Sequence, residues 1–309
     1  MDTAQKKWVG LLAVGCLVAG GGLACLAAAG LLVLGRSGST APLPAPAGGP
    51  QPATQAAPAT TAPRPGRISG RIAGADGQPV RVAGHRVRVQ VGGVTGRGEN
   101  VAFSPPVGPD GAYELEVPSG IYHGVRAELE VPFQGKAFVL ELEPVQDNTV
   151  DRRSDEGIVQ DFVWRVSGPR PGRVPDPNNH THWYGASIGL SFEFYRNDLK
   201  KPVPGPPPGT RATFRLEPRG PLVDGSAGSI LVFERSWDPS GQALLDKNLP
   251  DLPLGTYLLS AVETRPDGTQ RPLLIQKAFA EFVPSLEVSF QPKSFGGVEV
   301  PIIGFTRTE

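Results

Sequence analysis

The chain has 309 residues, with 30 basic and 30 acidic side chains, 40 glycines and 34 prolines. A net charge of zero argues against the broad positive field on which sequence-independent nucleic-acid binding depends, so we expect no nucleic-acid partner. The two cysteines, Cys16 and Cys25, both lie near the N-terminus. No disulfide can therefore connect the rest of the chain, and its stability must come from a hydrophobic core.

The first distinctive element is an apolar run without charge, residues 8–35. At ~1.5 Å per residue, a helix of this length crosses a hydrocarbon layer ~30 Å thick. Lys6 and Lys7 precede the run and Arg36 follows it, and this excess of positive charge on the N-terminal side favours a cytoplasmic N-terminus. We therefore expect residues 1–7 in the cytoplasm, a single-pass membrane anchor at 8–35, and the bulk of the chain outside the cytoplasm, in the cell envelope.

Two other interpretations of this run stay open. One is a cleaved signal peptide, because the three alanines before Gly30 have the small-residue form of a cleavage site, although apolar sequence continues beyond them. The other is lipidation of Cys16, whose preceding residues loosely match a lipobox. The membrane anchor is the interpretation that we favour.

The next segment, residues 36–66, consists almost entirely of Ala, Pro, Gly, Thr, Ser and Gln. It has no apolar periodicity and nothing to form a core, so it predicts a disordered linker. Its prolines favour an extended polyproline II geometry of ~3.1 Å per residue, which gives the linker a reach of up to about 90 Å. A spacer between the membrane and the folded part of the chain is the natural use.

Beyond the linker, apolar residues follow the period of two that is typical of half-buried strands. In residues 85–91, for example, valines share one face and polar side chains share the other. Short runs of this kind, separated by turn residues, predict an all-β fold of two antiparallel sandwiches, the first over residues 67–168. Trp164 alternates with other apolar residues and is expected in the core. The expected strands cover residues 67–72, 85–91, 112–117, 125–131, 136–142 and 158–166.

Several spaced elements of this first sandwich resemble the carboxypeptidase regulatory-like domain. They are Ile68-Ser69-Gly70-Arg71-Ile72, Asp76-Gly77-Gln78-Pro79, Pro109-Asp110-Gly111-Ala112-Tyr113 and Val117-Pro118-Ser119-Gly120-Ile121-Tyr122. The resemblance spans about residues 67–142 and departs from the family pattern in a glycine-rich stretch at 92–98. It implies a transthyretin-like sandwich with a supporting or binding role in an exported protein, and it does not imply peptidase activity.

A second transthyretin-like or Ig-like sandwich is expected over residues 184–309, after an interdomain segment at 169–183 where Pro, Gly and Asn cluster. Its Pro253-Leu254-Gly255-Thr256-Tyr257 repeats the Pro-x-Gly-x-Tyr order that ends in Tyr122. We therefore predict Tyr122 and Tyr257 at equivalent corners, each ring buried and each hydroxyl bonded to nearby backbone. The expected strands cover residues 187–195, 211–216, 229–235, 257–263, 271–282 and 286–290.

Residues 185–189 match the G-x-S-x-G nucleophile elbow of serine hydrolases, with Ser187 at its centre. That motif needs a helix after the serine and a histidine downstream. The residues after Ser187 continue in strand alternation, and no histidine follows His182. We therefore expect Ser187 in a strand, no catalytic residue and no enzyme activity.

His180 and His182 are the best metal candidates, because residues two apart on a strand point to one face and imidazoles bind zinc and copper. Asp176 is the candidate third ligand. A closed zinc site usually needs four protein ligands, and the other histidines belong to the first sandwich. A polar interdomain turn without a cofactor is the interpretation that we favour.

Trp183 and Tyr184 are the candidate ligand-binding residues, because exposed aromatic rings stack on sugar faces. The leading hypothesis is a non-enzymatic, membrane-anchored extracytoplasmic protein whose sandwiches mediate binding or structural contacts with an envelope protein or polysaccharide. The alternative is a carbohydrate-binding module that uses the Trp183 and Tyr184 patch. Imidazoles that converge at His180 and His182 would instead favour a metal-dependent enzyme.

Overall fold

The computed structural model describes residues 62–308, apart from residues 197, 242 and 279. The expected anchor and nearly all of the expected linker lie outside the described residues. Within the described part, no helix has the length and apolar character needed to span a membrane. The described chain is all-β, and its helical elements are two short 3-10 turns, η1 (Ser154–Glu156) and η2 (His180–His182).

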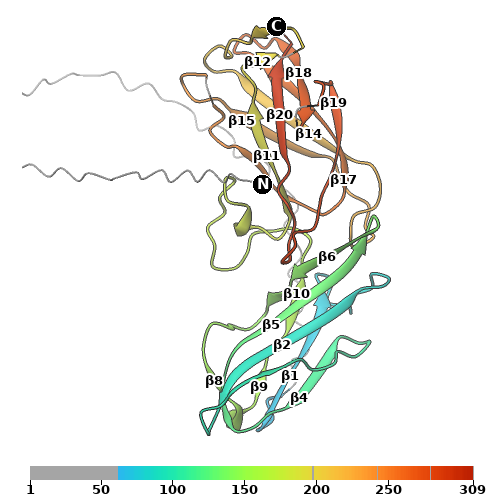
Figure 1. Ribbon diagram of the computed structural model, residues 1–309, viewed down its shortest axis with the longest axis vertical. Helices are drawn as coiled ribbons and strands as arrows, with labels where there is room; N and C mark the ends of the chain where they lie inside the picture. The colour runs from blue at the N-terminus through green and yellow to red at the C-terminus, as the bar shows by residue number, and fades with distance from the viewer. Residues whose placement is uncertain (1–61, 197, 242, 279, 309) are drawn as a thin grey trace, which may run out of the picture. The chain divides into compact units, whose positions relative to one another are not determined.

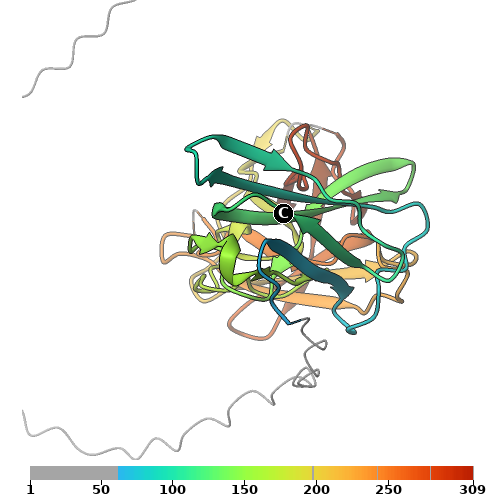
Figure 2. The ribbon, with the colours of Figure 1, turned by 90° about the horizontal axis from the view of Figure 1, so that it is seen from below.

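Two sheets form the first sandwich (Figure 1). One has the order β4-β1-β10-β7 with β9 also paired to β1, and the other has the order β3-β2-β5-β6 with β8 paired to β5. In Figure 2, β1 and the teal strand β2 lie in separate layers. The strands are β1 (Arg67–Gly74), β2 (Arg86–Thr95), β3 (Asn100–Phe103), β4 (Ala112–Glu116), β5 (Gly120–Phe133), β6 (Lys136–Glu141), β7 (Glu143–Pro144), β8 (Arg152–Arg153), β9 (Ile158–Val159) and β10 (Phe162–Trp164).

Alternation of side chains between the two faces builds the core of this sandwich. In β2, Val89 and Val91 are buried, whereas Arg88 and Gln90 are exposed, as the period of two predicts. Trp164 of β10 is 5% exposed, which confirms its predicted place in the core. The apolar face of each sheet is thus covered by the other sheet.

An eight-stranded sheet forms most of the second sandwich, in the order β15-β14-β17-β18-β20-β11-β16 with β19 paired to β17. The first half of β17 pairs with β19 and the second half with β18. Phe214 of β14 and Phe305 of β20 meet edge to face, 5.2 Å between ring centroids, so two parts of the sheet enclose one core. The strands, including a small β12–β13 pair, are β11 (Ala186–Phe192), β12 (Tyr195–Arg196), β13 (Lys201–Pro202), β14 (Arg211–Pro218), β15 (Leu231–Ser236), β16 (Asn248–Leu252), β17 (Thr256–Thr264), β18 (Gln270–Lys277), β19 (Ser285–Ser289) and β20 (Ile302–Arg307).

The prediction of purely antiparallel sandwiches is wrong. β1 pairs in parallel with β9 and β10, and β11 pairs in parallel with β20. The run expected as one strand at 158–166 is also divided into β9 and β10. It divides at Gln160 and Asp161, because the Tyr113 hydroxyl donates to the Gln160 carbonyl and the Asp161 carboxylate accepts from the Arg71 N–H, at 2.5 and 2.8 Å.

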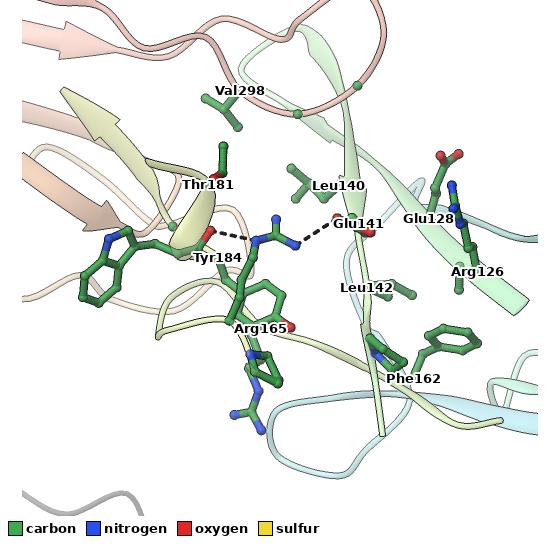
Figure 3. Close-up of a pocket in the computed structure, with 18 of the residues that line it drawn as sticks. Arg126, Glu128, Leu140, Glu141, Leu142, Phe162, Arg165, Thr181, Tyr184 and Val298 are labelled. Carbon is green, nitrogen blue, oxygen red and sulfur yellow. Dashed lines mark hydrogen bonds and ion pairs between the residues drawn. The ribbon is translucent and has the colours of Figure 1, made fainter. Parts of the chain in front are cut away.

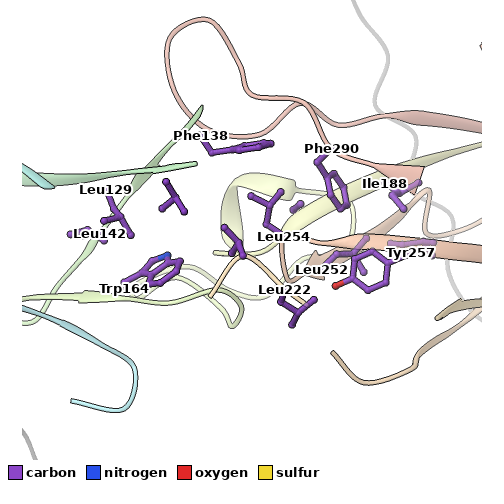
Figure 4. Packing of buried hydrophobic residues seen from close by; sticks show 14 of the residues in the cluster. Leu129, Phe138, Leu142, Trp164, Ile188, Leu222, Leu252, Leu254, Tyr257 and Phe290 are labelled. Atoms are coloured by element: carbon purple, nitrogen blue, oxygen red, sulfur yellow. The ribbon is translucent and has the colours of Figure 1, made fainter. Parts of the chain in front are cut away.

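Buried hydrophobic side chains form one cluster that includes residues of both sandwiches (Figure 4). Phe138 of β6 and Phe290, which follows β19, both belong to it and are 1% and 2% exposed. Among the described residues, no strand of one sandwich pairs with a strand of the other, and residues 165–185 contain one isolated bridge, between Pro169 and Trp183. The connection between the sandwiches is therefore made by side chains and loops.

Candidate functional site

Residues 165–185 link the two sandwiches and form what we call the linking segment. They include most of the residues that the sequence indicates as site candidates. His180 and His182 lie in the 3-10 turn η2, so the expectation that they lie on a strand is wrong. The Asn179 side chain starts this turn by accepting hydrogen bonds from the N–H and the hydroxyl of Thr181, at 3.1 and 2.7 Å. The Asn179 side chain thus satisfies a backbone N–H that would otherwise lack a partner at the start of the turn. This local hydrogen bond favours a 3-10 turn over a strand at residues 180–182.

Both ring nitrogens of His182 have partners inside this turn. Nδ1 donates to the Val174 carbonyl at 2.7 Å, and Nε2 accepts from the Asn179 amide at 2.9 Å. Burial, and then the nearby charge of Lys293, lower the pKa of His180. In the part of the chain that the structure describes, no three His, Cys, Asp or Glu side chains are placed to hold a metal ion. Asp176 instead accepts from the Asn178 N–H at 2.8 Å.

Trp183 and Tyr184, the predicted aromatic pair, are both partly buried. Trp183 contacts the Asp176 carbonyl, and Tyr184 contacts Arg170. Trp183 Nε1 donates to the Asp176 carbonyl at 2.9 Å. The guanidinium of Arg170 lies over the ring of Tyr184, 4.7 Å from its centroid, and also donates to Glu141 at 2.9 Å (Figure 3). Burial raises the pKa of Tyr184. One face of the Tyr184 ring is thus covered by Arg170 and is closed to a sugar.

Asp251, which no sequence motif marks, holds both ends of the linking segment. Its carboxylate accepts from the N–H of Gly168, at 2.7 Å for the shorter contact, and from the N–H of Gly185 at 3.2 Å. Asp251 has a φ of 59°, in the left-handed region. Burial raises the pKa of this carboxyl group, against the lowering effect of the two backbone hydrogen bonds. Gly168 and Gly185 approach the Asp251 carboxylate only in the folded chain, so no local sequence pattern predicts these hydrogen bonds.

A cleft of about 1020 Å³ opens beside the linking segment. Its walls come mainly from β5, β6, residues 144–149, the linking segment and the loop between β19 and β20, and both Trp183 and Tyr184 belong to them. In Figure 3, Leu140 and Glu141 of β6 lie across from Thr181 and Tyr184 of the linking segment. The cleft has a mixed lining in which charged side chains are prominent: Arg126, Glu128, Glu141, Asp147, Arg165, Arg170, Arg173 and Lys293.

The loop between β19 and β20 contributes Phe295, whose side chain is fully exposed to solvent at the edge of this cleft. The turn closes through hydrogen bonds from the Lys293 N–H to the Gly297 carbonyl and from the Gly296 N–H to the Lys293 carbonyl, at 3.1 and 3.2 Å. Gly296 and Gly297 both have positive φ, which glycine adopts without strain. The consecutive glycines mark this turn in the sequence, but the exposure of Phe295 follows only from the structure.

Ser187 lies inside β11, in keeping with the expected strand. Its side chain is 2% exposed, and the hydroxyl has no hydrogen-bond partner in the described residues. The strand runs on to Phe192 and no helix follows it, so the strand–turn–helix context of a nucleophile elbow is missing at this position. Ser187 thus packs as a small core residue.

Comparison with protein-family models gives no match, and comparison with curated proteins also gives none. Solved structures with some similarity include the Bacillus anthracis TIE protein, with 13% identity and a TM-score of 0.33 over 78% of this chain and 34% of that one. The match therefore spans about a third of the TIE chain. A C-terminal fragment of the pilus adhesin SpaC from Lactobacillus rhamnosus GG matches with 14% identity and a TM-score of 0.24, over 78% of this chain and 96% of the fragment. BcpA, the major pilin subunit of Bacillus cereus, matches with 8% identity and a TM-score of 0.19, over 78% and 98%. Likenesses this distant carry no argument about function.

Proposed function

We propose that this chain is a non-enzymatic, membrane-anchored protein of the cell envelope, with a cytoplasmic N-terminus and two sandwiches that present a binding surface outside the cytoplasm. The observation that carries the binding role is the cleft beside the linking segment, whose walls include residues of both sandwiches. A binding surface built from two domains keeps its shape only if the domains are held together. Hydrogen bonds and apolar contacts between the two sandwiches do this in the described part of the chain.

Backbone and side-chain groups make this connection at the loop between β19 and β20. The Gly297 N–H donates to the Val139 carbonyl of β6 at 2.7 Å, and the Lys136 ammonium donates to the Phe290 carbonyl at 3.3 Å. Phe138 and Phe290 add buried apolar surface next to these bonds. Because apolar burial and hydrogen bonds act together here, we expect the two sandwiches to move as one body.

The resemblance of the first sandwich to the carboxypeptidase regulatory-like domain supports this proposal. The Asp-Gly turns of the resemblance have glycine at positive φ, 75° at Gly77 and 82° at Gly111, as tight turns require. The resemblance implies a supporting or binding role in an exported protein. The apolar run at residues 8–35 and the linker after it support the proposed anchor and spacer.

Protease digestion of intact cells and spheroplasts tests the proposed location. With a C-terminal epitope tag on the full chain, we expect the tagged protein in the membrane fraction and its sandwiches cut by protease added from outside. A tag that stays protected until the cells are lysed contradicts the proposal. Release of a soluble protein that begins near Gly30 would instead support the signal-peptide alternative.

A carbohydrate-binding module is the second candidate function. The observation that favours it is the place of Trp183 and Tyr184 in the lining of the cleft. Retention of the full chain on a panel of immobilised polysaccharides tests it. Loss of retention in Trp183→Ala, with an unchanged melting temperature, is the result expected of a sugar-binding site.

A further inference from the structure

Three cations around the cleft have no partner of their own. Arg126, Arg173 and Lys293 are exposed, and within residues 62–308, gaps aside, none has an ion pair or a side-chain hydrogen bond. They differ in this from Arg165 and Arg170 of the same lining, which pair with Glu143 and Glu141. These three charges are therefore available to a ligand.

The acidic residues of the lining are engaged with the protein itself. Glu141 pairs with Arg170 at 2.9 Å, and Glu128 lies 4.0 Å from Arg88. Asp147 accepts hydrogen bonds from the N–H and the hydroxyl of Thr149. Asp147 forms no ion pair with a described residue, so the three unpaired cations of the lining outnumber its one unpaired carboxylate, although the whole chain has no net charge.

In the lining of the same cleft, Phe295 offers an aromatic ring that the fold leaves uncovered. Phe295 is fully exposed to solvent, whereas Phe138 and Phe290 are buried. The turn that carries it is anchored to β6 by the Gly297 hydrogen bond to Val139. Because the turn is anchored, the ring is held in a defined place, where it can pack against an apolar face of a ligand.

We propose that this cleft binds a polyanionic polysaccharide, a chain of sugars that carry carboxylate groups. Arg126, Arg173 and Lys293 bind the carboxylates, and Phe295 stacks on the C–H face of a sugar ring. A neutral glycan leaves the three cations unused, and an anion without an apolar face leaves Phe295 unused. The cleft has a volume of about 1020 Å³, at the upper end of the ~300–1,000 Å³ range of small-molecule sites. It is open to solvent, so it has room for several sugars of a polymer.

This inference deepens the proposed function, since it names the ligand class of the second candidate. It shifts the sugar contact from Tyr184, one face of which Arg170 covers, to Phe295. Protease protection of the tagged chain would contradict the envelope location and leave the binding result standing. A failure to bind acidic polysaccharide, together with correct protease accessibility, would contradict only this inference.

Binding of the purified full chain in mild detergent to immobilised polygalacturonate tests the proposal, with dextran as the neutral polymer and inorganic polyphosphate as an anion without sugar. We expect binding to polygalacturonate that weakens with salt, and none to dextran. The variant with Arg126→Gln, Arg173→Gln and Lys293→Gln should bind about tenfold more weakly or worse. Phe295→Ser should lose about fivefold on polygalacturonate and nothing on polyphosphate, and Phe295→Trp should retain binding.

Arg97→Gln is the control for a positive charge outside the cleft, because Arg97 is exposed and does not belong to the lining. It removes one positive charge and should change binding less than twofold, about the effect expected of a distant, screened charge. All five substituted residues are exposed, so the melting temperature should not change. Equal binding to dextran, an equal effect of Phe295→Ser on polyphosphate, or no binding to polygalacturonate would overturn the proposal.

Discussion

Tyr122 and Tyr257 make the same hydrogen bond in the two sandwiches. Each hydroxyl donates to the carbonyl of the proline four residues before it, Tyr122 to Pro118 at 2.9 Å and Tyr257 to Pro253 at 2.7 Å. Both rings are 1% exposed, which confirms the predicted burial at equivalent corners. Burial raises the pKa of both hydroxyl groups, so each remains a hydrogen-bond donor at neutral pH.

Removing either corner ring should therefore destabilise the protein more than removing its hydroxyl. We expect Tyr122→Ala or Tyr257→Ala to cost about 3 kcal/mol or more, through the lost burial and the cavity, and the phenylalanine variants about 1 kcal/mol. Hydrogen exchange of each variant should show the loss of protection mainly in its own sandwich. Equal losses in both sandwiches would contradict independent corners.

Glu263 and Arg307 form a buried ion pair, so neutralising one partner should be costly. Their side chains are 2% and 8% exposed, and Arg307 donates to both carboxylate oxygens of Glu263, at 2.6 and 3.1 Å. Glu263→Gln leaves a buried guanidinium without its counter-charge, which we expect to cost about 3–5 kcal/mol in urea unfolding. Glu234→Gln breaks the exposed pair with Arg211 and serves as the control, with an expected cost below about 1 kcal/mol.

Asp251 should make stability fall as pH rises. Because burial raises the pKa of its carboxyl group in the folded protein, its contribution is fully present below the unfolded pKa of ~3.9 and is lost as pH rises through the higher folded value. Asp251→Asn removes this titration, keeps an acceptor for Gly168 and Gly185, and suits the positive φ. The stability of this variant relative to wild type should thus increase with pH, as measured by urea unfolding from pH 3 to 8.

Asp267 supplies a control of the opposite sign. It is an exposed turn residue whose pKa is lowered by hydrogen bonds from Thr269, so its contribution is present above the unfolded pKa and is lost as pH falls. The stability of Asp267→Asn relative to wild type should decrease as pH rises. A parallel pH dependence of the two variants would contradict the account of Asp251.

Removing metal should leave the melting temperature unchanged, because both nitrogens of His182 are already engaged by Val174 and Asn179. His182→Ala should cost about 1–2 kcal/mol through these two hydrogen bonds, with or without chelator. A melting temperature that drops on chelation in the wild type, but not in His182→Ala, would instead support a metal site at His180, His182 and Asp176.

How far the sequence predicts the fold differs from element to element. The alternation that buries Val89 and Val91 identifies β2, because the face of a strand is a local property. The same pattern missed β3, β16 and β20, as well as the two-residue strands β7, β8 and β13. It also misjudged the direction of pairs that β1 and β11 make. Alternation specifies which face is buried, but it says nothing about which strand lies beside it or in which direction.

The sequence by itself determined the all-β class of residues 62–308 and the two corner tyrosines, because a Pro-x-Gly-x-Tyr segment contains both the donor and the acceptor of the corner within five residues. It also pointed to Trp183 and Tyr184, which do line the cleft. Only the tertiary structure decided that the Asp251 carboxylate accepts from both Gly168 and Gly185, and that the exposed Phe295 lines the same cleft as Arg126, Arg173 and Lys293. Most of these residues are far apart in the chain, and their arrangement is a property of the packed fold that local periodicity does not encode.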